Sequence, residues 1–151
     1  MSHAYVQFDV HAVFSTKNRK PFLHDPTIQR RVHAYLAEAI RCQDCSVELV
    51  GGTADHVHIL MGISQNTKFA EIMKEAKRVT TIWIHKEFSE LREFYWQSGY
   101  GAFSVSYSNR GRVRAYIDNQ IAHHARKSFQ DEFRQLLRKH GIPYDESTIW
   151  L

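Results

Sequence analysis

The hydrophobic period of this chain changes several times between about two residues and about 3.6 residues, and no other feature constrains the fold as strongly. Residues 5–14 alternate apolar and polar side chains, which predicts a strand with one buried face. Asp25 and Pro26 have the residue types of a helix start, and apolar residues at helical spacing follow as far as Ile40. The later strands are expected at 46–50, 56–63 and 102–107, and a second helix at about 69–83.

The element order βαββαβ, followed by two C-terminal helices, predicts an α+β fold of the ferredoxin-like type. Such a fold has a four-stranded antiparallel sheet with its two connecting helices on one face. A third helix is expected from residue 112 to about 127, and Ser128 begins a fourth helix that Gly141 and Pro143 end. The 151 residues contain no repeat and no linker, so we expect one domain that covers residues 1–151.

The two faces of the expected sheet differ in polarity. Apolar residues at alternate positions fill one face of the 56–63 strand, so His56 and His58 share the other face. The aromatic residues that this alternation assigns to the buried face are Phe8, Phe14 and Phe103. The opposite face is expected to be open and polar, with Gln7, Asp9, His11, His56, His58, Ser104 and Ser106. We expect the functional site on this polar face.

Composition and charge place the chain in a broad class. A net charge of +4 and a pI of about 9.1 favour a polyanionic partner, although many proteins of this charge bind no nucleic acid. No apolar run approaches the roughly 20 residues that span a bilayer, and the N-terminus lacks the pattern of a signal peptide. We therefore expect a cytoplasmic protein without a membrane partner, in which Cys42 and Cys45 are reduced thiols.

His56 and His58 are two residues apart on a strand, a spacing that brings two imidazoles to one metal ion. In the third helix, Tyr116 and Gln120 lie four residues apart and therefore share a helical face. A tyrosine beside a divalent metal is a workable nucleophile for phosphodiesters, and Mg²⁺ or Mn²⁺ suits such a site. A solvated histidine pair and a tyrosine at the edge of the core are the alternative interpretations.

Basic residues form groups near the first turn, on the second helix and at the start of the third helix. They are candidates for contacts with a nucleic-acid backbone, because cationic side chains supply most of that affinity. Solvated loops and helix faces explain the same pattern. The candidate DNA-binding residues are Lys17, Arg19, Lys20, Lys74, Lys77, Arg110, Arg112 and Arg114.

A series of short segments, in order along almost the whole chain, resembles one known family. The segments are residues 11–17 (HAVFSTK), 51–60 with DHVHIL at its end, 96–104 (WQSGYGAFS), 116–120 (YIDNQ) and the pair His123 and His124. They are similar to the single-tyrosine HUH transposases of the insertion-sequence 200/605 type. Such an ordered series is more specific than either short motif alone.

The resemblance implies that His56, His58 and Gln120 bind the divalent metal and that Tyr116 is the nucleophile. It also implies cleavage and rejoining of single-stranded DNA through a 5′-phosphotyrosine and a free 3′-hydroxyl, at element ends marked by hairpins. Members of the family act as homodimers, so the tyrosine helix is a candidate to serve the partner's histidines in a composite site. Gly111 would suit a hinge for that helix.

Three other interpretations remain beside this one. The first is a domesticated relative that acts on chromosomal repeats. The second is a ferredoxin-like nucleic-acid-binding module without catalysis, and the third is a metal-dependent hydrolase in which water attacks in place of Tyr116. His124 falls on the apolar stripe of its helix and His123 is ambiguous, so neither is placed in the expected site.

Overall fold

A computed structural model describes residues 3–151 and contains one four-stranded antiparallel sheet. The strand order is β2-β3-β1-β4, with consecutive neighbours antiparallel, which is the ferredoxin-like order that the sequence predicts. The strands are β1 (Phe8–Ser15), β2 (Ser46–Gly52), β3 (His56–Ile63) and β4 (Gly101–Val105). The α+β class and the four strands are therefore confirmed.

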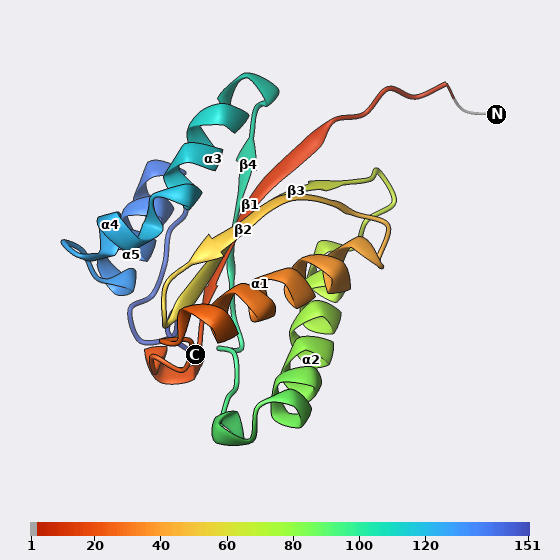
Figure 1. Cartoon of the computed structure of the whole chain (residues 1–151). Coiled ribbons are helices and arrows are strands. Elements are labelled where there is room, and N and C mark those ends of the chain that lie inside the picture. Colours follow the sequence, from red (N-terminus) through yellow and green to blue (C-terminus); the bar gives the residue numbers. More distant parts are fainter. Residues whose placement is uncertain (1–2) are drawn as a thin grey trace.

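Two helices, α1 (Pro26–Arg41) and α2 (Phe69–Glu87), cover one face of the sheet (Figure 1). The Asp25 carboxylate accepts hydrogen bonds from the amides of Thr27 and Ile28, so the predicted helix start is confirmed. The core between these helices and the sheet is apolar and fully closed to solvent, and includes Phe14, Leu36, Ile40, Ile59, Met61 and Ile84.

The opposite face of the sheet is covered, which corrects the expectation of an open face. Three C-terminal helices lie over it: α3 (Arg110–Asp118), α4 (Gln120–His124) and α5 (Phe129–Lys139) (Figure 1). A second apolar cluster fixes α5 there, formed by Val13, Phe103, Phe129, Phe133 and Leu137. Phe103 was expected among the α1 and α2 core, but it pairs with His11 across β1 and β4 and so faces α5.

Two glycines let the C-terminal helices approach the sheet closely. A Cβ atom on Gly51 of β2 would lie 2.6 Å from Cγ2 of Ile117 in α3. A Cβ atom on Gly101 of β4 would lie 2.6 Å from Cε2 of Phe133 in α5. Because real Cβ atoms do not come this close to other heavy atoms, a side chain at either position would force the neighbouring residue to move.

The segment expected as one helix over 112–127 is divided in two. Asn119, with φ −96° and ψ 16°, leaves helical geometry between α3 and α4. The first strand is also shorter than expected, because residues 3–7 extend from the sheet as an arm without strand pairing (Figure 1). Short 3₁₀ turns occur at Lys17–Arg19, Ser89–Leu91 and Tyr107–Asn109. Cys42 and Cys45 are free thiols, as predicted.

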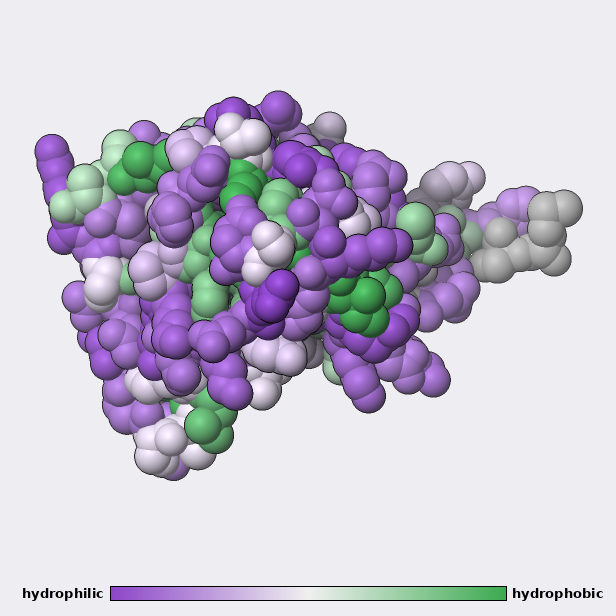
Figure 2. Space-filling view, turned by 60° about the horizontal axis from the view of Figure 1, so that its bottom comes forward, coloured by the Kyte–Doolittle hydropathy of each residue, from purple (hydrophilic) through white to green (hydrophobic). Residues whose placement is uncertain are grey.

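Hydrophilic side chains predominate on the end of the molecule shown in Figure 2, and the apolar side chains there form separate groups. Within residues 3–151, no helix combines the length and apolar character that crossing a bilayer requires.

Candidate metal centre and tyrosine site

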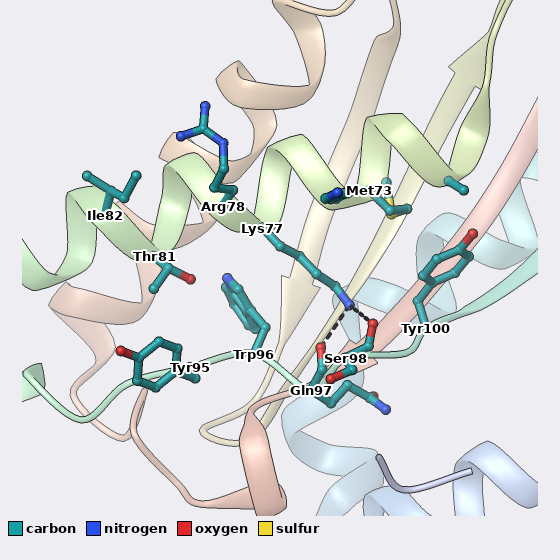
Figure 3. Close-up of a pocket in the computed structure, with 12 residues that line it drawn as sticks. Met73, Lys77, Arg78, Thr81, Ile82, Tyr95, Trp96, Gln97, Ser98 and Tyr100 are labelled. Carbon is teal, nitrogen blue, oxygen red and sulfur yellow. Dashed lines mark hydrogen bonds between the residues drawn. The ribbon is translucent and has the colours of Figure 1, made fainter. Parts of the chain in front are cut away.

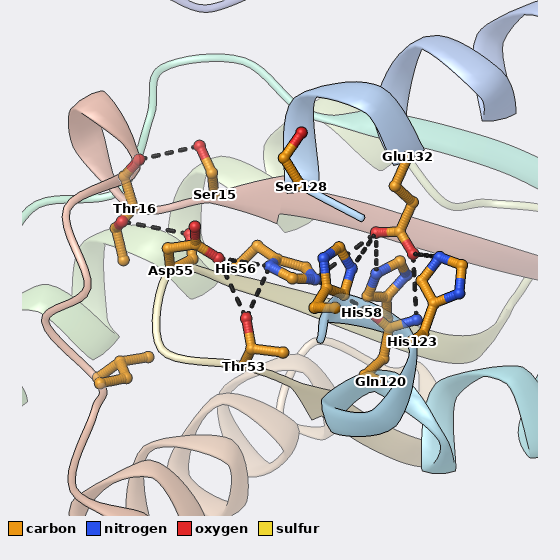
Figure 4. A network of polar contacts seen from close by, with 12 residues as sticks. Ser15, Thr16, Thr53, Asp55, His56, His58, Gln120, His123, Ser128 and Glu132 are labelled. Carbon is orange, nitrogen blue, oxygen red and sulfur yellow. Dashed lines mark hydrogen bonds and ion pairs between the residues drawn. The ribbon is translucent and has the colours of Figure 1, made fainter. Parts of the chain in front are cut away.

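His56 and His58 project from β3 onto the face that the C-terminal helices cover, and both are fully buried. Around them α4 places Gln120 and His124, and α5 places Glu132 (Figure 4). One ligand atom each from His56, His58, His124 and Glu132 lies within 4.8 Å of the others. The two histidines predicted from the sequence therefore belong to a larger buried cluster.

The spacing of the cluster's atoms fits one small divalent cation. His56 Nε2 lies 2.9 Å from Gln120 Oε1, and His58 Nε2 lies 2.9 Å from Glu132 Oε1. His56 Nε2 and the same Glu132 oxygen are 3.6 Å apart. Neighbouring ligands of an octahedral ion with bonds of about 2.1 Å are separated by about 3.0 Å. The cluster can hold a metal with only small movements of these side chains.

Both imidazoles are oriented through their other ring nitrogen. His56 Nδ1 lies 2.7 Å from Asp55 Oδ1 and 3.0 Å from Thr53 Oγ1 (Figure 4). His58 Nδ1 lies 2.8 Å from Nε2 of His11. These contacts direct the Nε2 atoms of His56 and His58 to the centre of the cluster, as outer hydrogen bonds do in metal sites.

The protonation states also favour metal binding. Burial lowers the pKa of His58 to about 4, so its imidazole is neutral at pH 7, the form that binds metals. In the tautomer in which His56 Nδ1 donates to Asp55, its Nε2 lone pair points to the amide oxygen of Gln120. Two electron pairs face each other at 2.9 Å in that arrangement, which a cation between them would stabilise.

Tyr116 of α3 lies directly beside this cluster. Its hydroxyl donates a short hydrogen bond to Oε2 of Glu132, and its ring centroid is 5.7 Å from that of His58. Burial, together with the Glu132 carboxylate, raises the pKa of Tyr116 above its ordinary value. Tyr116 is therefore a protonated phenol in this arrangement, and its proton must leave when the oxygen attacks an electrophile.

Gln120 joins the tyrosine to the histidines, although Asn119 interrupts the helix between them. Its side-chain amide donates to Glu132 Oε2 at 3.2 Å and, more weakly, to the Tyr116 carbonyl at 3.4 Å. Its oxygen remains directed at His56. The structure thus brings together the four residues that the sequence singles out: His56, His58, Tyr116 and Gln120.

Sequence reasoning missed two members of the cluster. Glu132 was not singled out, and His124 was assigned to packing. One signal was present for Glu132: it is three residues after Phe129 and adjacent to Phe133, so it lies on the apolar stripe of α5, where a carboxylate is unexpected. His124 falls on the apolar stripe of its helix, where a packed residue is expected, so its sequence position alone carries no such signal.

The candidate DNA-binding residues are spread over both faces of the molecule, and several are engaged within the chain. The Lys77 ammonium donates to the carbonyl of Gln97 at 3.0 Å (Figure 3) and to that of Gly99 at 2.6 Å. Burial lowers the pKa of Lys77 to about 8. Lys77 and Lys74 line a cavity of about 490 Å³ together with Trp96.

The cations near α3 and the first turn are placed differently. Arg110 and Arg114 both pair with Glu48 of β2, at 2.6 and 3.1 Å. Arg112 lines a cavity of about 190 Å³ beside Tyr116. In the first turn, the Arg19 guanidinium lies 5.5 Å from the Trp150 ring, whereas Lys17 and Lys20 are exposed. Arg112 thus lines the same cavity as Tyr116.

Comparisons with known proteins identify the family and agree with the fold. The sequence model of one protein family, described as Transposase IS200 like, matches residues 4–120. A solved structure from Deinococcus radiodurans R1, assigned as a transposase, has a TM-score of 0.66 and 20% identity, with coverage of 80% of this chain and 95% of that chain. A REP-associated tyrosine transposase bound to a REP hairpin has a TM-score of 0.52 and 14% identity, with coverage of 80% and 68%. At these identities the two structures show a shared fold, and no curated protein matches the chain.

Proposed function

Since the chain belongs to the IS200-like transposase family, we propose that it cleaves and rejoins single-stranded DNA with Tyr116 as the nucleophile. The observation that carries this proposal is a single shared carboxylate. Glu132 accepts the Tyr116 hydroxyl with one oxygen and contacts His58 with the other, so the nucleophile and the ligand cluster are joined. The alternative interpretation, a tyrosine that only packs at the edge of the core, does not account for this hydrogen bond to the cluster.

In the proposed reaction, the Tyr116 oxygen attacks a DNA phosphorus and the bond from phosphorus to the 3′ oxygen breaks. The protein gains a 5′-phosphotyrosine and loses the hydroxyl proton of Tyr116, while the departing 3′ oxygen takes up a proton. Attack by the 3′-hydroxyl of another strand reverses the step and releases Tyr116. Because the phosphotyrosine conserves the energy of the phosphodiester, rejoining needs neither ATP nor water.

His56, His58 and Gln120 would hold a Mg²⁺ or Mn²⁺ ion, which supplies polarisation of the scissile phosphate and offsets its developing charge. Imidazole ligands favour Mn²⁺ over Mg²⁺. The fit of the donor atoms to one small cation supports this assignment.

The proposed substrate is single-stranded DNA with stem-loop ends. The cavity beside Tyr116 is lined by Arg112 and Lys139 together with the polar residues Asn109 and His140. Cations at that position suit the phosphates on either side of the cleaved bond. A domesticated relative acting on chromosomal repeats would use the same site. The proposed DNA substrate is consistent with a protein that acts in the cytoplasm.

We propose that the active form is a homodimer. The outer edge of β4 has no strand partner among residues 3–151, and edge strands of this kind pair readily with a second chain. Exposed apolar side chains occur close in sequence to the end of the sheet where β4 stops: Phe8 (50% exposed) begins β1, Tyr107 (71%) follows β4, and Tyr5 (97%) lies on the arm before β1. A second copy of the chain would cover them.

The nucleophile is tested by incubating the protein with Mn²⁺ and end-labelled single-stranded DNA that carries a stem-loop. Wild type should form a covalent adduct that survives denaturing electrophoresis, and Tyr116→Phe should form none. Tyr35→Phe is the matched control, because Tyr35 stacks on Trp83 on the far side of the sheet. Cleavage by Tyr116→Phe without an adduct would identify water as the nucleophile and overturn the proposal.

The metal role is tested with His56→Ala. This variant should lose cleavage and retain most of its binding to the hairpin, which an electrophoretic mobility shift measures. Thermal melting of the same variant in EDTA provides the control for folding. Cleavage at the wild-type rate by a folded His56→Ala protein would contradict the assignment.

A further inference from the structure

Glu132 is the residue around which the whole cluster is arranged. Its side chain is buried, with 1% exposure. Glu132 lies on α5, which follows α3 and α4 in the chain. Its Oε1 lies 2.9 Å from His58 Nε2 (Figure 4) and 3.1 Å from His124 Nε2. Its Oε2 accepts hydrogen bonds from Tyr116 and Gln120. The matched family segment ends at residue 120, so the comparisons assign no role to His124 or Glu132.

The charge of Glu132 lacks a permanent cationic partner. Every ion-pair contact that this carboxylate makes within the described residues is to a histidine, none to a lysine or an arginine. A carboxylate this deeply buried is costly unless a cation compensates it. A divalent ion in the centre of the cluster would supply that compensation.

His124 supplies an independent observation. Its Nε2 atom is buried and makes no hydrogen bond of good geometry, although it lies 3.1 Å from Glu132. Its ring centroid is 4.3 Å from that of His56, and a ring nitrogen of His124 lies within 4.8 Å of the other ligand atoms. A buried imidazole nitrogen without a hydrogen bond of good geometry, beside a buried carboxylate whose only ion-pair contacts within the described residues are to histidines, indicates a position for a metal ion.

We propose that His124 and Glu132 complete the metal site, adding a third imidazole and a carboxylate oxygen to His56, His58 and Gln120. The inference rests on the proposed function for the presence of a metal, and it extends the ligand set beyond the matched segment. Five protein donors leave one position of a six-coordinate ion for a phosphate oxygen. Three imidazoles and one carboxylate favour Mn²⁺ over Mg²⁺ more strongly than the smaller set does.

The second oxygen of Glu132 gives the same residue a positioning role. Because Oε2 accepts the Tyr116 hydroxyl and Oε1 faces the histidines, the carboxylate fixes the distance between the nucleophile and the metal position. Loss of Glu132 should therefore weaken metal binding and also release the tyrosine side chain.

The experiment measures Mn²⁺ binding by the decrease of the free-ion electron paramagnetic resonance signal, with no DNA present. Glu132→Gln should raise the Kd about 10- to 100-fold, a range typical of losing a group that holds a metal site together. Asp131→Asn, the neighbouring and exposed carboxylate of α5, should bind as wild type. Melting in EDTA checks that each variant is folded.

A spectroscopic measurement counts the imidazoles directly. Pulsed electron paramagnetic resonance of bound Mn²⁺ should detect three coupled imidazole nitrogens in wild type and two in His124→Asn. This variant tests the ligand set independently if Glu132→Gln fails to fold.

The outcomes separate this inference from the function on which it rests. Wild-type affinity in folded Glu132→Gln, or two imidazole nitrogens in wild type, would overturn the inference and leave the His56, His58 and Gln120 site intact. A wild-type protein that binds no Mn²⁺, or a His56→Ala variant that binds it normally, would instead remove the metal from the proposed function.

Discussion

At the scale of single residues, the site depends on positions where a side chain is absent as much as on those where one is present. Gly51 pairs with His58 across β2 and β3 and lies under α3. A Cβ at this position would approach not only the Ile117 side chain but also its carbonyl oxygen, at 3.0 Å. Ile117 follows Tyr116 directly in α3. The distance between Gly51 and Ile117 therefore helps to set how far Tyr116 lies from the histidines of β3.

Gly51→Ala should therefore push α3 away from the sheet and separate Tyr116 from Glu132. We expect a loss of about 1–3 kcal/mol in the free energy of unfolding, typical of overpacking, and a larger proportional loss in adduct formation. Urea unfolding and the adduct assay measure the two effects. Gly111→Ala is the control, because a Cβ there meets no atom within 4 Å, and its stability should not fall. Normal adduct formation by Gly51→Ala would show that α3 can shift without consequence.

His33 of α1 gives a prediction for pH. Burial, and to a lesser extent the charge of His56, lowers the pKa of His33 to about 4 from an ordinary value near 6.5. Between these values the unfolded chain binds a proton that the folded chain does not, so stability falls as the pH drops from 6.5 to 4. His33→Gln should reduce that slope by up to about one proton in urea unfolding at several pH values. An unchanged slope would show that His33 titrates normally in the folded protein.

At the scale of elements, the accuracy of the sequence analysis follows from how local each signal is. The β3 strand was predicted at its observed limits, because an alternating pattern between two turns is a local property. The burial of the second face was not predicted, because α5 packs there through contacts between residues far apart in sequence, such as Phe133 and Gly101. The break at Asn119 was also missed, since α4 is held by its contacts with β3 and α5 and not by its own sequence pattern.

The site residues divide in the same way. His56, His58, Tyr116 and Gln120 were found because each lies in a short motif of recognisable spacing. Glu132 lies 74 residues from His58 and comes into contact with it only through the packing of α5. No spacing rule connects them, so only the folded chain reveals this contact.

The position of α5 should matter for the metal as well as for stability. Phe133→Leu removes aromatic contacts next to Glu132 and should lower the free energy of unfolding by about 1–3 kcal/mol. Because Glu132 then loses its fixed position, Mn²⁺ affinity in the folded protein should also fall. Leu36→Val in the core under α1 is the matched control, with a similar loss of stability and unchanged affinity. Equal affinities in the two variants would show that α5 packing does not position the ligands.

At the scale of the whole molecule, the sheet separates two layers with different tasks. The α1 and α2 layer holds the large apolar core, and the α3, α4 and α5 layer holds the polar cluster with a smaller core at one side. Within the described chain, Tyr116 reaches the histidines of its own chain. A composite site, the candidate arrangement that the family resemblance offers, requires α3 to give up its contacts with β2, including those of Arg110 and Arg114 with Glu48.

These contacts lead us to expect that each tyrosine serves its own chain. A mixture of Tyr116→Phe and His58→Ala chains, allowed to exchange subunits, should then form no covalent adduct, since neither chain holds both the nucleophile and both histidines. If the sites were composite, random exchange would give half mixed dimers with one intact site each, and about a quarter of wild-type adduct would return. Size-exclusion chromatography with light scattering must first show that dimers form and exchange. Recovery to about a quarter would establish that α3 moves to the partner, and that the contacts between Tyr116 and Glu132 described above form between chains.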